Sequence, residues 1–508
     1  MHQSDDTDYA DTNFSKALAV NPNDFAALYQ LGITRARQGL VAQARVLLEQ
    51  AHAMQPDQPD VLVALGNLLG QSNQSGLAFS HYNRALEVYP GHAGALINMG
   101  CLFHSHRQYR EAVATYDRLL SKPEQILCLV NRALALHELG QLEEALVTLD
   151  YAHMLAPADP ETLLARGKVH QAMHRPSKAE ADYRNFLSLR PTDVEARIEL
   201  AKVVGAQGGH SAGLKLLDEV LLVRPSHLNA HFYRGNILRD QRKLAEAVDA
   251  YDQALRHEPD FSNAEWNKGL CLLLAGDFAR GWPLYEARKR LPVPIEARNY
   301  TAPLWTGQQS LAGKKLFLYT SQGLGDTIHF FRFIKPLEDM GARVILSCQD
   351  ELSNLLSGGN TKTEILASLQ TPAEFDFHCP LPSVPLALNS RENTIPAEFP
   401  YLLADERRAE HWANRIGSSG FRIGICWQGA PLGADNSRSF PLALLADISR
   451  MQGVRLISLQ KGPEAEQLAS LPSGMVVESI EPFDDGPQAF LDTAAIMAGL
   501  DLVVTPDT

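Results

Sequence analysis

Prolines divide the first half of the chain into segments of nearly equal length, and small residues recur at a fixed place in each segment. The prolines are spaced by 34 residues with a single spacing of 33, at positions 22, 56, 90, 123, 157, 191, 225 and 259. When position one is the third residue after each proline, position eight holds Gly32, Gly66, Gly100, Ala133, Gly167, Ala201, Gly235 and Gly269. Small residues are expected where two helices approach closely, so the pattern predicts packed helices in every segment.

Two further positions repeat with the same period. Position 20 is held by Ala44, Ala78, Ala112, Ala145, Ala179 and Ala247. Position 24 is held by Leu48, Tyr82, Tyr116, Leu149, Tyr183, Leu217, Tyr251 and Tyr285. Proline at position 32 ends the second helix because it cannot continue one. The pattern closely resembles the tetratricopeptide repeat, in eight copies over residues 25 to about 290.

A half repeat precedes the eight full ones. Ala10, Phe14 and Ala17 fall on positions 20, 24 and 27, so only a second helix is expected there. This helix is either a cap or the remainder of a shortened N-terminus. We therefore expect an α-solenoid over residues 1–290, whose concave face, built from first helices, binds a protein or an extended peptide.

Asparagines occupy positions six and nine of several repeats. They are Asn67, Asn98, Asn131, Asn236 and Asn267. An asparagine amide both donates and accepts, so a row of them can hold a peptide backbone in a groove. The row resembles, more distantly, the asparagine ladder of protein O-GlcNAc transferases, although Ala64, Ala165 and Glu199 interrupt it. The alternative is that these are merely solvated polar positions.

Helical periodicity ends after residue 290. A linker over 291–313 precedes a β-rich run at 315–320, a turn "SQGLG", an apolar-periodic helix from 326 and a strand at 343–348. This succession predicts a parallel α/β unit. Gly323 and Gly325, followed by Asp326 and Thr327, form a loop whose backbone could turn sharply beside a ligand. Asp326 is either a ligand-facing carboxylate or only the N-cap of the helix.

A second α/β unit follows. Strands are expected at 421–429, 454–460 and 501–505, with helices from residue 442 and over 490–500. The fold class is therefore an α-solenoid followed by α/β, with two Rossmann-like lobes in a GT-B arrangement. The first lobe, on the acceptor side, spans 314–402, a connecting helix lies in 403–420, and the second lobe, on the donor side, spans 421–508.

Several motifs of this half resemble bacterial heptosyltransferase-like glycosyltransferases of the family 9 type, closest to those fused to tetratricopeptide repeats. "GLGDTIHFFRFIKPL" resembles their first-lobe motif and places Asp326 on the acidic residue regarded as catalytic base. "RSFP" places Arg438 against the donor diphosphate, and "LQKGPEAEQL" places Gln460 and Lys461 near the donor. "TPDT" matches the start of a donor-binding segment and adds Asp507 and Thr508.

The resemblance implies an inverting, metal-independent transferase with a nucleotide-sugar donor as substrate and no cofactor. In that family a histidine and an alanine-rich helix follow the "TPDT" segment, whereas the sequence ends at Thr508. We therefore expect the second lobe to be C-terminally incomplete. The alternative function is a non-catalytic interaction scaffold that carries a degenerate or truncated transferase domain.

Charge and composition limit the kinds of partner that the chain is expected to bind. The net charge of the 508-residue chain is −13 without a block of basic residues, which argues against nucleic acid and anionic membranes. No run of about 18 apolar residues predicts a membrane span, so we expect a cytoplasmic protein. Six cysteines without a C-x-x-C pair are expected to be buried free thiols, and no histidine–carboxylate cluster predicts a metal site.

Overall fold

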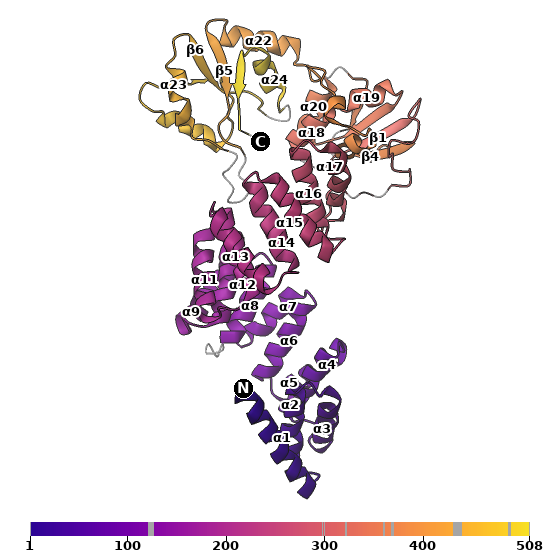
Figure 1. Ribbon diagram of the computed structural model, residues 1–508, viewed down its shortest axis with the longest axis vertical. Coiled ribbons are helices and arrows are strands. Elements are labelled where there is room, and N and C mark those ends of the chain that lie inside the picture. Colours follow the sequence, from indigo (N-terminus) through magenta and orange to yellow (C-terminus); the bar gives the residue numbers. More distant parts are fainter. Residues whose placement is uncertain are drawn as a thin grey trace. The chain divides into compact units, whose positions relative to one another are not determined.

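The structure is a computed structural model of the 508-residue chain. It describes residues 2–119, 126–296, 298, 300–320, 323–358, 361–366, 370–429, 439–485 and 489–506, without the side chains of residues 2–10 and 464. The chain divides into two compact units, Met1–Gln207 and Gly208–Thr508 (Figure 1). Each unit is described by itself.

The first unit consists of helix pairs. Its helices are α1 (His2–Val20), α2 (Phe25–Arg37), α3 (Val41–Met54), α4 (Pro59–Gln71), α5 (Ser75–Val88), α6 (Ala93–Ser105), α7 (Tyr109–Asp117), α8 (Ile126–Glu138), α9 (Leu142–Leu155), α10 (Pro160–Ala172), α11 (Pro176–Leu189) and α12 (Val194–Ala206). Asp24, Asp159 and Asp193 cap the first helices of their repeats, each accepting an N–H three residues on. The predicted helical solenoid is confirmed.

The small residues at position eight receive the side chain at position 24 of the same repeat. A Cβ atom added to Gly66, Gly167 or Gly235 would lie 2.5–2.6 Å from a ring carbon of the facing tyrosine. Both partners are buried, and Ala44, Ala78 and their equivalents at position 20 are fully enclosed. The close approach predicted for position eight is therefore confirmed, and the residue that approaches it is the one at position 24.

The second unit begins with more helix pairs. These are α13 (His210–Val223), α14 (Leu228–Asp240), α15 (Leu244–His257), α16 (Ser262–Leu274) and α17 (Phe278–Tyr285), which continues as a 3-10 turn over Glu286–Arg290. Trp282 and Tyr285, from α17, belong to the same hydrophobic core as the first β-sheet. The last repeat and the first sheet thus bury their apolar surface against each other.

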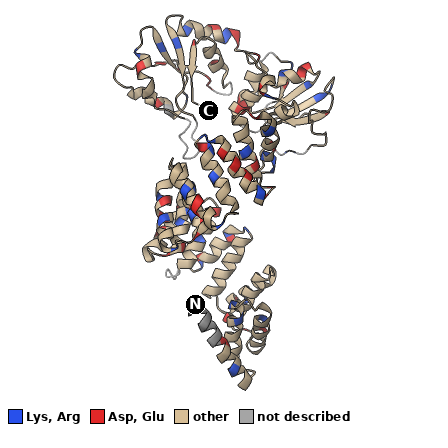
Figure 2. Ribbon diagram, viewed as in Figure 1, with Lys and Arg blue, Asp and Glu red and all other residues tan. Residues whose placement is uncertain are grey.

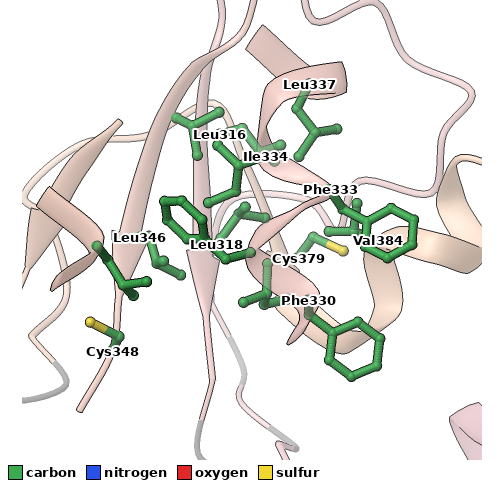
Figure 3. Packing of buried hydrophobic residues seen from close by; sticks show 14 of the residues in the cluster. Leu316, Leu318, Phe330, Phe333, Ile334, Leu337, Leu346, Cys348, Cys379 and Val384 are labelled. Atoms are coloured by element: carbon green, nitrogen blue, oxygen red, sulfur yellow. The ribbon is translucent and has the colours of Figure 1, made fainter. Parts of the chain in front are cut away.

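The first sheet has four parallel strands in the order β3-β2-β1-β4. The strands are β1 (Lys315–Tyr319), β2 (Arg343–Ser347), β3 (Glu364–Leu366) and β4 (Phe377–Pro380). Around them lie α18 (Leu324–Phe331), α19 (Ile334–Asp339), α20 (Asp350–Ser357), 3-10 turns at Leu381–Ser383 and Glu392–Thr394, and α21 (Val384–Ala387). Leu316, Leu318 and Leu346 pack against Phe330 and Ile334 (Figure 3).

One predicted helix is divided in two. The sequence predicts a single helix from residue 326, whereas the structure has α18 and α19, separated at Arg332 and Phe333. Pro336 explains the break, because its ring would clash with the carbonyl of Arg332 in a continuous helix.

The second sheet repeats the arrangement of the first. Its parallel strands β5 (Phe421–Ile425), β6 (Val454–Ser458), β7 (Glu478–Ser479) and β8 (Leu502–Val504) have the order β7-β6-β5-β8. Helix α22 (Glu406–Ile416) precedes it, and α23 (Ala446–Ser449), 3-10 turns at Leu442–Leu445 and Pro463–Ser470, and α24 (Leu491–Ala498) connect its strands. The predicted strands are found, while β3, β4 and β7 were not predicted.

The six cysteines are free thiols. Cys128, Cys271, Cys348 and Cys379 are buried as expected, and Cys426 is half-buried. Cys101 is exposed, which corrects the expectation of burial. It lies at position nine of its repeat, and its sulfur faces Tyr116 Oη at 3.5 Å and Asn131 Nδ2 at 3.4 Å.

Charged residues of both signs are interspersed along the helices and strands (Figure 2). None of the described helices is both long and apolar enough to span a membrane.

Candidate functional site

The carboxyl ends of β1 and β5 occupy equivalent places in the two sheets. Each of these strands lies between one neighbour that follows it directly along the chain, β2 or β6, and one that closes the sheet on the other side, β4 or β8. The order of the strands therefore reverses beside β1 and beside β5. In open parallel sheets, ligands bind in the crevice outside the carboxyl ends at such a reversal.

The first turn of α18 lies at the carboxyl end of β1 and carries the predicted loop residues. Gly323 is the N-cap of α18, and Leu324, Gly325 and Asp326 follow as the first three helical residues. The interpretation of Asp326 as the N-cap is therefore wrong. Its carboxylate is exposed to solvent, in the first turn, where the unpaired N–H groups of a helix favour negative charge.

Gly323 makes room for the Asp326 carboxylate. Its φ of −60° is ordinary for any residue, so the turn itself does not require glycine. A Cβ atom at this place would lie 3.3 Å from Asp326 Oδ2, closer than most side-chain contacts. The glycine therefore leaves the carboxylate free to turn back over the start of the helix.

Thr327 anchors this turn and is itself buried. Its hydroxyl donates to the Gln349 side chain at 3.0 Å, and its exposed fraction is 1%. Gln349 is the residue before α20, so the bond fixes α18 to the neighbouring β2–α20 connection. Thr327 thus holds the loop in place and is not open to a ligand.

His329 was not singled out from the sequence. It lies one turn after Asp326 on α18, close enough for the carboxylate to act on its ionisation. Partial burial of the ring and the Arg332 guanidinium lower the pKa of His329, and Asp326 opposes them. The imidazole is therefore neutral near pH 7, beside the predicted base. The i, i+3 spacing on a helix is the signal that could have identified it.

Gln460 follows β6 and holds the turn after β5. Its Oε1 accepts the backbone N–H groups of Trp427 at 3.1 Å and Gln428 at 3.0 Å, and its Nε2 donates to the Gln428 carbonyl at 3.1 Å. Its exposed fraction is 5%. The side chain is therefore engaged within the sheet and shapes the strand end where a ligand would lie.

Lys461 is bound to the segment before α24. Its Nζ donates to the Phe483 carbonyl, to the Asp484 carbonyl at 3.2 Å and to Asp485 Oδ1 at 3.1 Å. The ammonium also lies 4.9 Å from the centre of the Phe483 ring. These bonds fix residues 483–485 to the end of β6 and use much of the donor capacity of the lysine.

The start of α24 contributes side chains to the core of the first sheet. Phe490, Leu491 and Ala494 contact the core of the first sheet, as do Leu324 and Ile328 from α18. The structure thus brings Gly323, Gly325, Asp326 and Thr327 together at β1, and Gln460 and Lys461 together at β6. Three predicted donor-binding residues, Arg438, Asp507 and Thr508, lie outside the described residues.

The asparagines of the repeats form a hydrogen-bonded series. Tyr82 Oη and Asn98 Nδ2 both donate to Asn67 Oδ1, each at 2.7 Å. The same arrangement recurs where Tyr251 Oη and Asn267 Nδ2 donate to Asn236 Oδ1, at 2.7 and 2.9 Å.

Each such amide therefore links one repeat to the next. Cys101 takes the place of the accepting asparagine before Asn131. Four of the five amides are half-buried, and Asn267, at 9% exposed, is buried. They are therefore not merely solvated. Their role in holding a peptide stays a prediction.

No metal-binding group is evident in the part of the chain that the structure describes. Nowhere among these residues do three or more His, Cys, Asp or Glu side chains lie close enough together to hold a metal ion.

Comparison with known proteins identifies the repeats. The family profile described as "Tetratricopeptide repeat" matches residues 3–59, 198–256 and 234–289. The profile described as "Psidin, N-terminal TPR repeats region" matches residues 103–202. The helical part of the chain is therefore a tetratricopeptide-repeat solenoid, as the sequence predicts.

Among curated relatives, Protein FlbA of Caulobacter vibrioides is 25% identical over 460 residues, which cover 78% of this chain and 77% of FlbA. Human Protein O-mannosyl-transferase TMTC3 is 25% identical over 266 residues, or 51% of this chain and 29% of TMTC3. The match thus spans less than a third of the transferase. A protein-interaction role fits the repeats.

Two solved structures of tetratricopeptide-repeat proteins resemble part of the chain. A tetratricopeptide repeat protein from Parabacteroides merdae is 19% identical and covers 47% of this chain and 95% of its own, with a TM-score of 0.42. YrrB, titled "a TPR protein with an unusual peptide-binding site", is 20% identical and covers 36% of this chain and 95% of its own, with a TM-score of 0.31.

Proposed function

We propose that the chain is a glycosyltransferase whose repeats bind a protein acceptor and whose two α/β lobes transfer a sugar from a nucleotide-sugar. One observation carries the proposal: two parallel sheets of the same strand order follow one another, and the first presents an exposed carboxylate, Asp326, at the carboxyl end of its β1 strand. Two such lobes are what a GT-B enzyme of heptosyltransferase-like type needs.

In the proposed reaction, Asp326 is the general base. It takes the proton of an acceptor hydroxyl while the hydroxyl oxygen forms a bond to the anomeric carbon of the donor sugar. The bond from that carbon to the diphosphate oxygen breaks on the opposite side, so the configuration inverts. A positioned base of this kind contributes about 10²–10⁴-fold. The space above Gly323 lets the carboxylate turn toward the acceptor.

The departing diphosphate needs positive charge and N–H donors. In the proposal these come from Arg438 and from backbone amides near Asp507 and Thr508. Gln460 and Lys461 lie by the donor, and the bonds of Gln460 to Trp427 and Gln428 keep the end of β5 in shape for it. Cations and amides do the work of a metal ion here, so the reaction needs neither metal nor cofactor.

The repeats supply the acceptor. Solenoids of this type present a concave surface, and we propose that the asparagine series faces it and holds an extended peptide of the acceptor. The relative named as a protein O-mannosyl-transferase supports a protein acceptor, although the match covers 29% of its length. In this proposal the protein is a bacterial, cytoplasmic enzyme.

An interaction scaffold without catalysis is the second candidate. It is favoured by Gln460 and Lys461, whose polar atoms are engaged within the second sheet and are not directed to a ligand. In that case the repeats alone would carry the function.

Donor binding distinguishes the two candidates. Calorimetric titration of the full chain with UDP, GDP, ADP and CMP should give saturable binding of one of them. Arg438→Ala should weaken it by about tenfold or more, because a charge-assisted contact contributes about 1.5–3 kcal/mol. Arg450→Ala, which removes an exposed cation bound to Asp447 on the same lobe, is the matched control and should change little. Absence of binding, or equal binding by the Arg438 variant, would favour the scaffold.

A further inference from the structure

A second hollow lies on the other face of the first sheet. Side chains alternate between the faces of a strand, so Phe317 and Tyr319 point away from Leu316 and Leu318, which pack under α18. On their side there is a cavity of about 460 Å³. This volume falls within the roughly 300–1,000 Å³ typical of small-molecule sites.

The floor of this cavity is aromatic. The ring of Tyr300, from the segment that leads to β1, lies 5.5 Å from the ring of Tyr319 and 5.0 Å from that of His378. Phe317 and Phe375 pack on the same ring, each at 5.6 Å. Among the described residues, these rings stand where a parallel sheet usually has a helix. They cover the sheet without filling the space above it.

The rim carries more positive than negative charge. Glu296 bonds to the Arg288 guanidinium at 3.4 Å, and Glu286 bonds to Arg288 and Lys289. Both carboxylates are thus paired within this cluster. Arg298 has no carboxylate partner in the described part of the chain, and its guanidinium lies 5.1 Å from the centre of the Tyr319 ring. Of the charged residues that line the cavity, Lys289 and Arg298 are cations and Glu296 is a carboxylate, which leaves one positive charge.

His378 adds a neutral hydrogen-bonding group. The imidazole is 6% exposed, and its Nδ1 lies 3.4 Å from Tyr319 Oη. Burial and the nearby Lys289 ammonium lower the pKa of His378, so the ring is uncharged near pH 7. It can therefore hydrogen-bond a ligand without adding a second positive charge.

We propose that this cavity binds a small organic oxyanion, with one carboxylate or phosphate group held by Arg298 and the body of the molecule against Tyr300 and Leu304. The planar fork of an arginine fits either oxyanion, and an aromatic wall favours a planar body. The site is separate from the proposed catalytic base, because it lies on the opposite face of the first sheet from α18, which carries Asp326. It does not depend on the proposed glycosyl transfer.

Titration calorimetry of the full chain tests the site. The probes are benzoate, phenyl phosphate, acetate, inorganic phosphate and the neutral benzyl alcohol, each up to roughly 10 mM. We expect benzoate or phenyl phosphate to bind saturably, acetate and inorganic phosphate more weakly, and benzyl alcohol not at all. Which aromatic probe binds better distinguishes a carboxylate from a phosphate ligand, and either supports the proposal.

Three variants test whether the probes bind in this cavity. Arg298→Gln should weaken it by at least about tenfold, as expected for a lost charge-assisted contact. Leu304→Trp keeps every charge and fills the space, so it should also abolish binding. Arg343→Gln removes an exposed cation of the same sheet outside the cavity and should bind like the wild type. Absence of saturable binding by all the anions, or equal affinity in the Arg298 and Leu304 variants, would overturn the proposal.

Discussion

Glycine faces tyrosine inside the repeats wherever position 24 is a tyrosine. Gly66, Gly100, Gly167 and Gly235 each meet the ring of the tyrosine 16 residues later. Alanine at position eight occurs only opposite leucine, in the pairs Ala133–Leu149 and Ala201–Leu217. Gly32 opposite Leu48 is the exception, and a Cβ atom there would lie 2.8 Å from Leu48 Cγ. In the other repeats the two positions vary together in size, as expected where two helices pack closely.

Gly66→Ala tests this size rule. The added methyl would lie 2.6 Å from a carbon of the Tyr82 ring, so we expect a loss of about 1–3 kcal/mol in the unfolding free energy of the α4–α5 pair. Gly76→Ala, in the neighbouring α5, meets nothing within 4 Å and is the control, with no loss and a gain of up to about 1 kcal/mol.

Denaturant-dependent amide exchange in α4 and α5 measures both variants. In the Tyr82→Leu background, which recreates the Ala–Leu pair found in two other repeats, Gly66→Ala should cost less than it does opposite Tyr82. Equal stability of Gly66→Ala and the wild type would contradict the rule.

Only part of the candidate site could be predicted from the sequence. Gly323 and Asp326 stand in one short turn, so the sequence predicts their proximity. The hydrogen bonds of Gln460 reach residues 32 and 33 positions earlier, and only the pairing of β5 with β6 brings them together. A pattern within one segment cannot show such a contact.

At the scale of elements, α24 begins in an unusual way. Its N-cap residue, Phe490, provides no side-chain acceptor, and the carboxylate of Asp484 instead accepts the N–H groups of Asp492 at 2.7 Å and Thr493 at 3.0 Å. Asp492 in turn accepts from Arg408 at 2.7 Å and Trp412 at 3.0 Å, both on α22. The Asp484 carboxylate thus caps the start of α24, and the Asp492 carboxylate joins α24 to α22.

The contact between α22 and α24 should depend on pH. Burial alone would raise the pKa of Asp492, but hydrogen bonds from Trp412, the Asp484 backbone and Arg408 outweigh it and lower the pKa below the ordinary 3.8. A lowered pKa gives stability that is present above the unfolded value and is lost as the pH falls through the folded one.

Asp492→Asn should therefore melt a few degrees below the wild type at pH 6, and the difference should shrink as the pH falls below the ordinary carboxyl pKa of 3.8. Melting curves between pH 6 and 2.5 measure it, with the exposed Asp447→Asn as control. A difference that is constant over this range would contradict the account.

The elements that could be predicted are those whose pattern is local and repeated. The period of 34 residues identifies the helix pairs, and apolar runs identify β1, β2, β5, β6 and β8. In contrast, β3 and β7 span three and two residues, and β4 reads Phe-His-Cys-Pro. Segments so short acquire their strand conformation from neighbouring strands, which a single sequence does not display.

At the scale of the second unit as a whole, the last repeat is fastened to the first sheet by buried charges. The Arg288 side chain is fully buried and bonds to Glu286 at 2.6 Å and to Ser383 Oγ, beyond β4, also at 2.6 Å. Glu296 is buried beside it. Together with the shared core of Trp282 and Tyr285, this cluster joins the last repeat to the first sheet.

Arg288→Ala should loosen that join. It would leave the buried Glu296 carboxylate without the Arg288 cation, which costs about 3–5 kcal/mol for a buried pair, whereas Glu286 would keep Lys289. Amide exchange should accelerate both in α17 and in residues 377–384. Arg290→Ala removes a surface pair with Glu265 and should cost at most about 1 kcal/mol. Faster exchange in α17 alone would show that the cluster does not couple the two parts.

The central claim is that Asp326 is a catalytic base. The turnover of an Asp326 variant tests this claim most directly. With the nucleotide-sugar that binds, the release of nucleoside diphosphate by the full chain is compared between wild type, Asp326→Asn and the control Asp339→Asn, whose carboxylate pairs with Lys335 on the surface. The account predicts that Asp326→Asn lowers turnover by about 10²-fold or more, leaves donor affinity nearly unchanged, and that the control stays active. Equal turnover in Asp326→Asn and the wild type, or no turnover with any nucleotide-sugar, would contradict it.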